Sequence, residues 1–284
     1  MGGGSYSVSS YTARAKAKGF HEKSVSEIFT QRQLNNAMNP KGIKVRESRD
    51  SDEHPNSVPI IIALDTTGSM GNIPHELVQD GLNKVMGSLL QNGIADPQVL
   101  FLGVGDHECD NAPLQVGQFE SSDELLEKWL TAVYLERGGG GNSGESYLLS
   151  WFFAGNYTAI DSFEKRGKKG FLFTIGDEPT LRNLPADAQR EIMGDGQYSD
   201  LTVEQTLEKA REKYFVYHIH LTETASGSRP EYQDDWKQLI GQDLVIVDDR
   251  REIPSTIADI VLQNTRQEKP SESSVSDSDV EIIL

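Results

Sequence analysis

The chain has 284 residues, 36% of them hydrophobic, and a net charge of −17, which suits one large α/β domain with extensions rather than two equal domains. Its single cysteine, Cys109, excludes an intrachain disulfide. No apolar run approaches the roughly 18 residues of a membrane span or forms a signal core, so we expect a soluble, cytoplasmic protein in a reducing compartment.

Charge divides the chain unevenly. Residues 1–49 carry nine Lys or Arg against three Glu, a net of +6, and the remainder carries −23. So acidic a surface repels nucleic acid and attracts cations and basic partners. Because the basic charges are scattered and accompanied by few aromatic residues, we expect the basic segment to dock on the acidic body of the protein rather than on nucleic acid.

Residues 1–57 are predicted to form this basic N-terminal extension. Residues 1–19 have no clear period and are expected to be flexible or loosely draped over the domain. Ser24 and Glu27 have the spacing of a capping box, which predicts one short amphipathic helix between Ser24 and Met38. The following sequence GIKVRES has the composition of an edge strand.

The stretch Val58 to Met70, VPIIIALDTTGSM, begins the central domain. Its Ile- and Val-rich run predicts a parallel strand buried on both faces, and Asp65 ends that strand, where open α/β sheets keep their sites. The carboxylate of Asp65 and the hydroxyls of Thr67 and Ser69 are hard oxygen ligands that suit Mg²⁺, Mn²⁺ or Ca²⁺. The alternative interpretation is a strand-to-helix turn whose Asp and Ser cap the helix.

Helical and strand patterns then alternate as far as residue 264. We predict helices after Asn72 and around Leu125–Val133, then a strongly apolar helix over 143–154, and later helices after Pro185, Thr202 and Asp234 and over 253–262. The predicted strands are 58–64, 99–104, 114–119, 170–175, 214–221 and 243–247. This alternation predicts an α/β fold with a doubly wound, mainly parallel, Rossmann-like sheet covered by helices on both faces, over residues 58–264.

Three segments together resemble von Willebrand factor type A (vWA) domains. D-T-T-G-S-M is similar to the D-x-T/S-x-S signature of their metal ion-dependent adhesion site (MIDAS), and Gly176-Asp177 is similar to its third element. RGGGGNSGES is similar to the glycine-rich second loop, although Gly141 or Asn142 stands where the family has Thr, and Asn142 with Glu145 is closer to a G-G-G-D-x-P-E version. The resemblance implies a vWA fold and a metal ion held by Asp65, Thr67, Ser69, Asp177 and Asn142, with Ser143 as the alternative to Asn142.

The resemblance also implies a non-catalytic, metal-dependent protein-binding module. Neutral hydroxyls leave a divalent ion only partly neutralised, so a partner's Asp or Glu can replace a bound water and complete the shell. Intracellular relatives often serve as adaptors in larger assemblies, including ones with AAA+ ATPases, which implies that kind of partner here.

Two rival functions remain open. D-T-T-G-S also resembles the D-x-D-x-T signature of haloacid dehalogenase-like phosphotransferases, with Asp65 as nucleophile, Asp248 and Asp249 as a late acidic pair and Thr174 as the middle hydroxyl. Thr67 stands where that family has its second Asp and cannot serve as a general acid. The third interpretation is a structural scaffold with an empty metal site, favoured by the irregular second loop.

Three other features of the sequence are not assigned to a binding or catalytic site. The loop GDHECDN, residues 105–111, lacks zinc spacing and predicts a polar hairpin turn. His218 and His220 alternate on one strand and suit ordinary packing. Residues 265–284 form an acidic tail, disordered by composition, whose apolar end, Val280 to Leu284, suits strand addition to a partner or packing on its own domain. The oligomeric state stays open.

Overall fold

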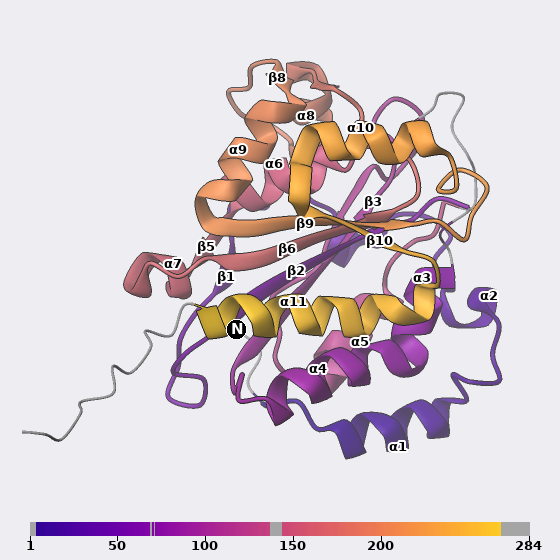
Figure 1. Cartoon of the computed structure of the whole chain (residues 1–284), viewed down its shortest axis with the longest axis vertical. Coiled ribbons are helices and arrows are strands. Elements are labelled where there is room, and N and C mark those ends of the chain that lie inside the picture. The colour runs from indigo at the N-terminus through magenta and orange to yellow at the C-terminus, as the bar shows by residue number, and fades with distance from the viewer. Residues whose placement is uncertain (1–3, 69, 71, 137–143, 268–284) are drawn as a thin grey trace, which may run out of the picture.

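The computed structural model describes residues 4–68, 70, 72–136 and 144–267. In this part of the chain, six strands form the central sheet in the order β10-β9-β6-β2-β3-β4 (Figure 1). Neighbouring strands pair in parallel except for the antiparallel hairpin of β3 and β4. The predicted doubly wound, mainly parallel sheet is thereby confirmed. Its strands are β2 (Val58–Asp65), β3 (Pro97–Val104), β4 (Leu114–Val116), β6 (Gly170–Gly176), β9 (Tyr214–Leu221) and β10 (Leu244–Val247).

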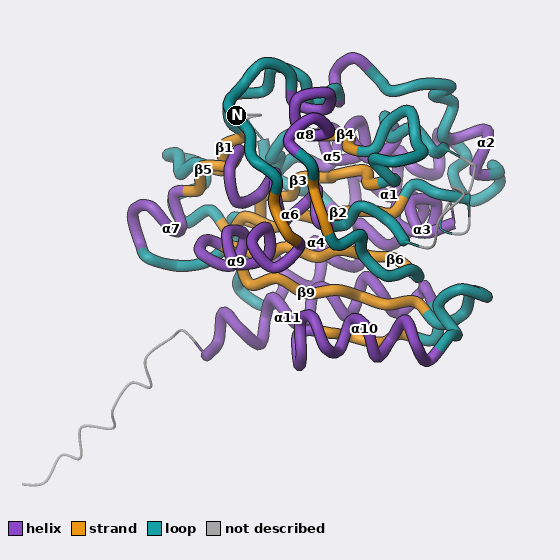
Figure 2. The backbone as a smooth tube through the Cα atoms, turned by 90° about the horizontal axis from the view of Figure 1, so that it is seen from above, coloured by secondary structure: helices purple, strands orange, loops and turns teal. Residues whose placement is uncertain are grey.

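Helices cover both faces of this sheet (Figures 1 and 2). One face carries α1 (Val8–Lys18), α3 (Asn72–Glu76), α4 (Leu82–Gln91), α5 (Asp123–Thr131) and α11 (Ile253–Gln267). The other carries α6 (Leu148–Tyr157), α8 (Ala186–Met193), α9 (Val203–Lys213) and α10 (Pro230–Ile240). Along β2, Ile60, Ile62 and Leu64 belong to the first core, and Ile61 and Ala63 belong to the second. Burial on both faces explains why this strand reads as a continuous apolar run.

The helix predicted after Asn72 is divided into α3 and α4 by a π-helical turn, Leu77–Gly81. A β-carbon at Gly81 would lie 3.0 Å from Cγ of Pro254 in α11, so the two elements pack closely here. Only glycine permits that approach without a shift of either element.

The N-terminal extension is more ordered than its sequence predicts. The expectation of flexibility is wrong from Val8 onward, where α1 begins after its N-cap, Ser7. The single helix expected between Ser24 and Met38 is also wrong. The Ser24–Glu27 capping box starts only the four-residue α2 (Val25–Ile28), and a 3₁₀ turn, η1 (Asn36–Met38), follows separately. Phe29 ends α2 because its backbone leaves the helical region and its side chain is buried in the core.

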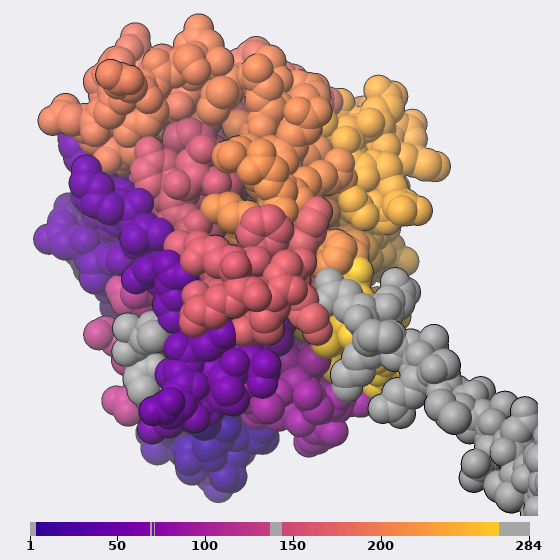
Figure 3. Space-filling model, turned by 90° about the vertical axis from the view of Figure 1, so that its left-hand side faces the viewer, coloured from indigo at the N-terminus to yellow at the C-terminus, as the bar shows by residue number. Residues whose placement is uncertain are grey.

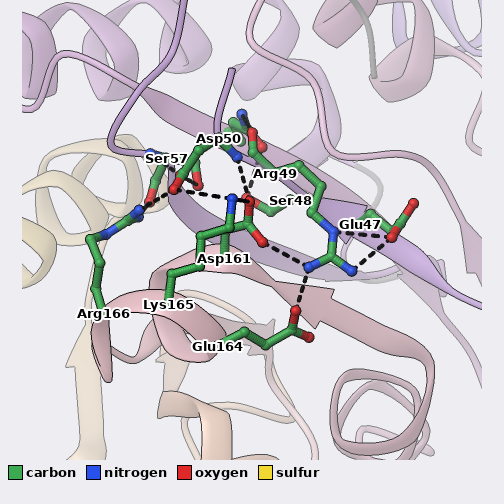
Figure 4. Close-up of polar contacts among 10 residues, drawn as sticks. Glu47, Ser48, Arg49, Asp50, Ser57, Asp161, Glu164, Lys165 and Arg166 are labelled. Atoms are coloured by element: carbon green, nitrogen blue, oxygen red, sulfur yellow. Dashed lines mark hydrogen bonds and ion pairs between the residues drawn. The ribbon is translucent and has the colours of Figure 1, made fainter. Parts of the chain in front are cut away.

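The strand predicted in GIKVRES exists but lies outside the main sheet. β1 (Arg46–Ser48) pairs with β5 (Thr158–Ile160), just before α7 (Asp161–Arg166). Figure 3 shows this end of the molecule, where α7 lies beside the segment that precedes β2. Arg49 bonds to Glu47, Asp161 and Glu164 (Figure 4). These ion pairs attach the extension to the body of the protein.

The segment after β6 holds a short ribbon, β7 (Asn183–Leu184) with β8 (Leu201–Thr202), on either side of α8. The helices predicted after Pro185 and Thr202 are both confirmed, and the second has its complete capping box. Among the described residues, no helix combines the length and the apolar character needed to cross a membrane.

Candidate metal centre

Asp65 and Asp177 lie at the same edge of the sheet. Leu64 of β2 is paired with Ile175 of the adjacent parallel strand β6. Asp65 therefore ends β2 and Asp177 directly follows β6 at their common carboxyl end, and both side chains are buried, at 1% and 0% exposure. The fold thus brings together two acids that are more than a hundred residues apart in the sequence.

Both oxygens of Asp65 accept hydrogen bonds. Oδ1 accepts from the amide of Thr67 at 2.8 Å and from its hydroxyl at 2.5 Å, and Oδ2 accepts from the hydroxyl of Tyr147 at 2.6 Å. Burial raises the pKa of Asp65 to about 7, the bonds from Thr67 and Tyr147 oppose that rise, and the charge of Asp177 adds to it. Each carboxylate oxygen has two lone pairs, so Oδ2 keeps one for a further donor or a cation.

Glu145 adds a third carboxylate beside these two. The main-chain amide of Glu145 donates to the main-chain oxygen of Pro179, and its main-chain oxygen accepts from the amide of Leu181. These two bonds hold Glu145 against the loop after β6. Burial, followed by the charge of Asp65, raises the pKa of Glu145 to about 10. Its Oε2 is buried without a hydrogen-bond partner among the described residues. A buried, unsatisfied carboxylate oxygen next to another acid is costly, and a bound cation would relieve both costs.

The remaining predicted ligands lie outside the described residues: Ser69, Asn142 and its alternative Ser143. Within the described ranges, no group of three or more His, Cys, Asp or Glu side chains is placed to hold a metal ion. The oxygen atoms of Asp65, Thr67 and Asp177 are of the kind that hard cations prefer, and all three side chains are buried. They would form only part of a ligand set, which needs further hydroxyl or amide oxygens.

Tyr147 is a site residue that the sequence analysis missed. Its apolar surroundings led to its assignment to the core helix, and it is indeed fully buried. Nothing in the sequence pattern shows that its hydroxyl reaches Asp65, because that contact depends on how α6 crosses the sheet. Glu145 entered the sequence analysis only as a match to a loop pattern.

The loop predicted as a polar hairpin turn packs close to the buried acid Glu145. The amide and Nδ1 of His107 lie 2.9 and 2.7 Å from Oγ of Ser146, which directly follows Glu145. Asp106 is 1% exposed, and the charges of Asp110 and Asp106 contribute to the raised pKa of Glu145. The predicted turn therefore adds negative charge to the neighbourhood of the site.

The residues expected for a phosphotransferase are not assembled. Asp248 and Asp249 follow β10, which β9 and β6 separate from β2. Asp249 bonds to Arg251. The hydroxyl of Thr174 pairs with Nδ1 of His218 at 2.9 Å, and His218 stacks on Trp236, as packing predicts.

A cavity of about 370 Å³ opens beside Thr67. Thr67 and Gly68 of the β2–α3 loop line this cavity. It is also lined by three residues of the N-terminal extension, Ser24, Val25 and Ser26. The extension is held there by a contact of 2.9 Å between Nε2 of His75 in α3 and the main-chain oxygen of Lys23. The extension therefore forms part of the wall of a cavity that reaches Thr67, the residue that bonds to Asp65.

Comparisons with known proteins support the fold. No family model and no curated protein matches the chain. The pilus adhesin SpaC from Lactobacillus rhamnosus GG, in its open conformation, matches with 12% identity and a TM-score of 0.51, over 79% of this chain and 31% of that one. This chain therefore spans less than a third of SpaC, and the likeness shows the fold alone.

Two other solved structures are similar at lower scores. The vWF domain of the type V pili tip protein Mfa5 from Porphyromonas gingivalis has 11% identity and a TM-score of 0.48, over 74% of this chain and 95% of that one. Proximal thread matrix protein 1 from the mussel byssus has 10% identity and a TM-score of 0.47, over 72% of this chain and 48% of that one.

Proposed function

We propose that this chain is a vWA-like, non-catalytic protein-binding module with a MIDAS-type metal site. Asp65, Thr67 and Asp177, together with Ser69 and Asn142, would hold Mg²⁺, with Mn²⁺ or Ca²⁺ as alternative ions. When bound, the ion supplies a Lewis-acidic position that an Asp or Glu of a partner protein completes. The description of SpaC as an adhesin accords with a binding role for a protein of this fold.

One observation carries this proposal: Asp65 and Glu145 are buried acids, and burial disfavours their ionised form in the metal-free protein. Among the described residues, neither Asp65 nor Glu145 forms an ion pair with Lys or Arg. Burial raises the pKa of both, and the charge of Asp177 adds to the rise for Asp65, as the charge of Asp65 does for Glu145. Buried charges in proteins are normally paired or bound to metals, which supports a cation as the partner of these acids.

The charge of the chain limits the kind of partner. The acidic body repels a uniformly acidic protein, so we expect an acid that reaches the metal from otherwise neutral or basic surroundings. The cavity beside Thr67 and the exposed Gly68 are where we expect that side chain to approach. We place the protein in the cytoplasm as an adaptor, with an AAA+ ATPase or another complex subunit as partner; the vWA resemblance and the single cysteine support this part.

Calorimetric titration with Mg²⁺ and Mn²⁺ tests the metal site, and the empty-scaffold alternative predicts no binding. We expect wild type to bind and Asp65→Ala to lose binding, whereas Asp80→Ala, which removes an exposed acid in the same half of the chain, should bind normally. A thermal melt follows the same event, because an ion at 100 times its dissociation constant stabilises the fold by about 2.7 kcal/mol. Absence of binding to wild type would contradict the proposal.

The enzymatic alternative has its own assay. Hydrolysis of p-nitrophenyl phosphate in the presence of Mg²⁺, abolished by Asp65→Asn, would replace the binding module with a phosphotransferase. We expect no such turnover. Capture of partners with Mg²⁺ and with EDTA then tests the binding role, and the captured protein should lose binding when its own metal-directed acid is changed to Ala.

A further inference from the structure

We infer that Tyr147 is a positioning residue that fixes the Asp65 carboxylate and thereby sets the preference of the metal site for Mg²⁺ over Ca²⁺. The inference rests on the proposed function. It assigns to a buried aromatic side chain a role in ion selection that the metal-site pattern itself does not contain.

The first step is the contact itself. The hydroxyl of Tyr147 donates to Oδ2 of Asp65 at 2.6 Å, while Thr67 donates twice to Oδ1. Three donors on two oxygens determine the plane of the carboxylate and leave it little rotational freedom. Without the phenol, only Oδ1 remains anchored, and the carboxylate can turn about χ2, a torsion with broad minima.

The second step is that Tyr147 is itself held firmly. Its ring is fully buried, lies 5.6 Å from that of Trp236 in α10 and meets the edge of His218 in β9 at 5.2 Å. A β-carbon at Gly176 would lie 1.7 Å from the Tyr147 hydroxyl oxygen, so the backbone of β6 closes the remaining side. The phenol therefore cannot follow a carboxylate that moves.

The third step connects this aromatic cluster with the other loops. The indole N–H of Trp236 donates to the main-chain oxygen of Glu178, the neighbour of Asp177, at 2.9 Å. Oε2 of Glu178 in turn accepts from the amide of Gly144 at 3.0 Å. Tyr147 thus holds the last residue of β2, and Trp236 holds the loop after β6, which Glu178 ties to Gly144 before α6.

The physical consequence is a difference between ions. Mg²⁺ requires near-ideal octahedral geometry at about 2.0 to 2.1 Å, whereas Ca²⁺ accepts six to eight oxygens at 2.3 to 2.6 Å in flexible arrangements. A mobile Asp65 should therefore weaken Mg²⁺ binding much more than Ca²⁺ binding. Loss of a group that orients a metal ligand typically lowers affinity by about 10- to 100-fold.

The experiment is calorimetric titration of the full chain with Mg²⁺ alone and with Ca²⁺ alone. For Tyr147→Phe we expect Mg²⁺ affinity to fall by about tenfold or more and Ca²⁺ affinity by less than about threefold. The ratio of Mg²⁺ affinity to Ca²⁺ affinity should therefore fall. Tyr157→Phe is the matched control: it removes a phenol at the other end of α6, which contacts Tyr198 and not the site. Its affinities should equal those of wild type.

Each outcome decides between the two proposals. If wild type binds neither ion, the proposed function fails and this inference fails with it. If wild type binds and Tyr147→Phe keeps the wild-type ratio, whether by no loss or by an equal loss for both ions, this inference alone is overturned. If Tyr147→Phe does not fold, Trp236→Phe decides, because it removes the indole that holds the Tyr147 ring and the bond to Glu178 and leaves the Tyr147 hydroxyl in the chain. We expect a shift of its ratio in the same direction, and an unchanged ratio would overturn the inference.

Discussion

The Tyr147 hydroxyl and the backbone of Gly176 are packed against each other so tightly that no side chain fits between them. An added β-carbon at position 176 would lie 1.7 Å from the hydroxyl oxygen and 2.4 Å from Cζ of the ring. This relationship fixes the height at which α6 rests on the sheet, and therefore the reach of Tyr147 toward Asp65.

Gly176→Ala should consequently damage both stability and the metal site. The new methyl group displaces the phenol and leaves Oδ2 of Asp65 without its donor, and overpacking of this kind costs about 1 to 3 kcal/mol. Urea unfolding measures the loss. Gly87→Ala in α4 is the control, because its β-carbon would meet only Cγ2 of Val8, at 3.3 Å. Equal stability of the two variants would contradict this account of the packing.

Asp65→Asn should have the opposite effect on the metal-free protein. The amide keeps the shape and the bond to Thr67, and its nitrogen donates to the Tyr147 hydroxyl in place of accepting from it, while the charge that burial and Asp177 make costly is removed. We expect stability in EDTA to rise by about 1 kcal/mol, and the stabilisation by Mg²⁺ to disappear. Thermal melts with EDTA and with Mg²⁺ measure both effects, with Asp80→Asn as the exposed control. A less stable metal-free variant would show that Asp65 is not under electrostatic strain.

The sequence was sufficient to predict the sheet, because the apolar residues of β2 indicate a strand that is buried on both faces. Ile60 to Leu64 are apolar on both faces, and the helices that follow have clear periodicity or capping boxes, as Thr202 and Gln205 do. It was also sufficient to place Asp65 and Asp177 at one edge, since parallel strands order their carboxyl ends.

Other features depend on long-range contacts that local patterns do not encode. α1 has a weak amphipathic pattern, and Tyr11 and Ala15 are buried only because α4 and α5 lie beneath them. Tyr147 looks like any core aromatic until α6 is placed over Gly176. The helix expected to reach Met38 ends at Ile28 because burying Phe29 outweighs the propensity of the polar residues that follow.

Acid should weaken the attachment of α7 to the segment before β2. Burial opposes ionisation of Asp161, but hydrogen bonds from Lys165, the Asp50 amide and Arg49 outweigh it and lower the pKa of Asp161 to about 2. A carboxyl whose folded pKa lies below its unfolded value stabilises the fold above the unfolded pKa, near 4, and loses this contribution as pH falls toward 2. Asp161→Asn should therefore cost on the order of 2 kcal/mol at pH 7 and progressively less below pH 4.

Urea unfolding of wild type and Asp161→Asn between pH 7 and pH 2.5 measures this difference. Asp187→Asn serves as the control, because Asp187 is 94% exposed and forms only a surface pair with Arg190. A difference between wild type and Asp161→Asn that grows as the solution becomes more acidic would contradict the assignment.

Arg14 should hold α1 on the acidic body of the protein. Its guanidinium lies 2.6 Å from Asp123 and 2.7 Å from Glu127, whose side chains are 10% and 3% exposed. Arg14→Ala leaves both acids buried without their main cation, at a cost of about 2 kcal/mol or more. Arg32→Ala is the control, since Arg32 is exposed and forms no ion pair with the described residues. Limited proteolysis within residues 19–24, beside α1, reports the release of the helix.

A mutant cycle separates the ion pairs from simple loss of side-chain packing. Asp123→Asn and Glu127→Gln together remove both acids that Arg14 contacts, so Arg14→Ala should cost less in that background than in wild type. An equal cost in both backgrounds would mean that Arg14 acts through the packing of its aliphatic chain and its contact with the Tyr11 ring, 5.8 Å away. The basic charges of the extension would then not be what docks it on the domain.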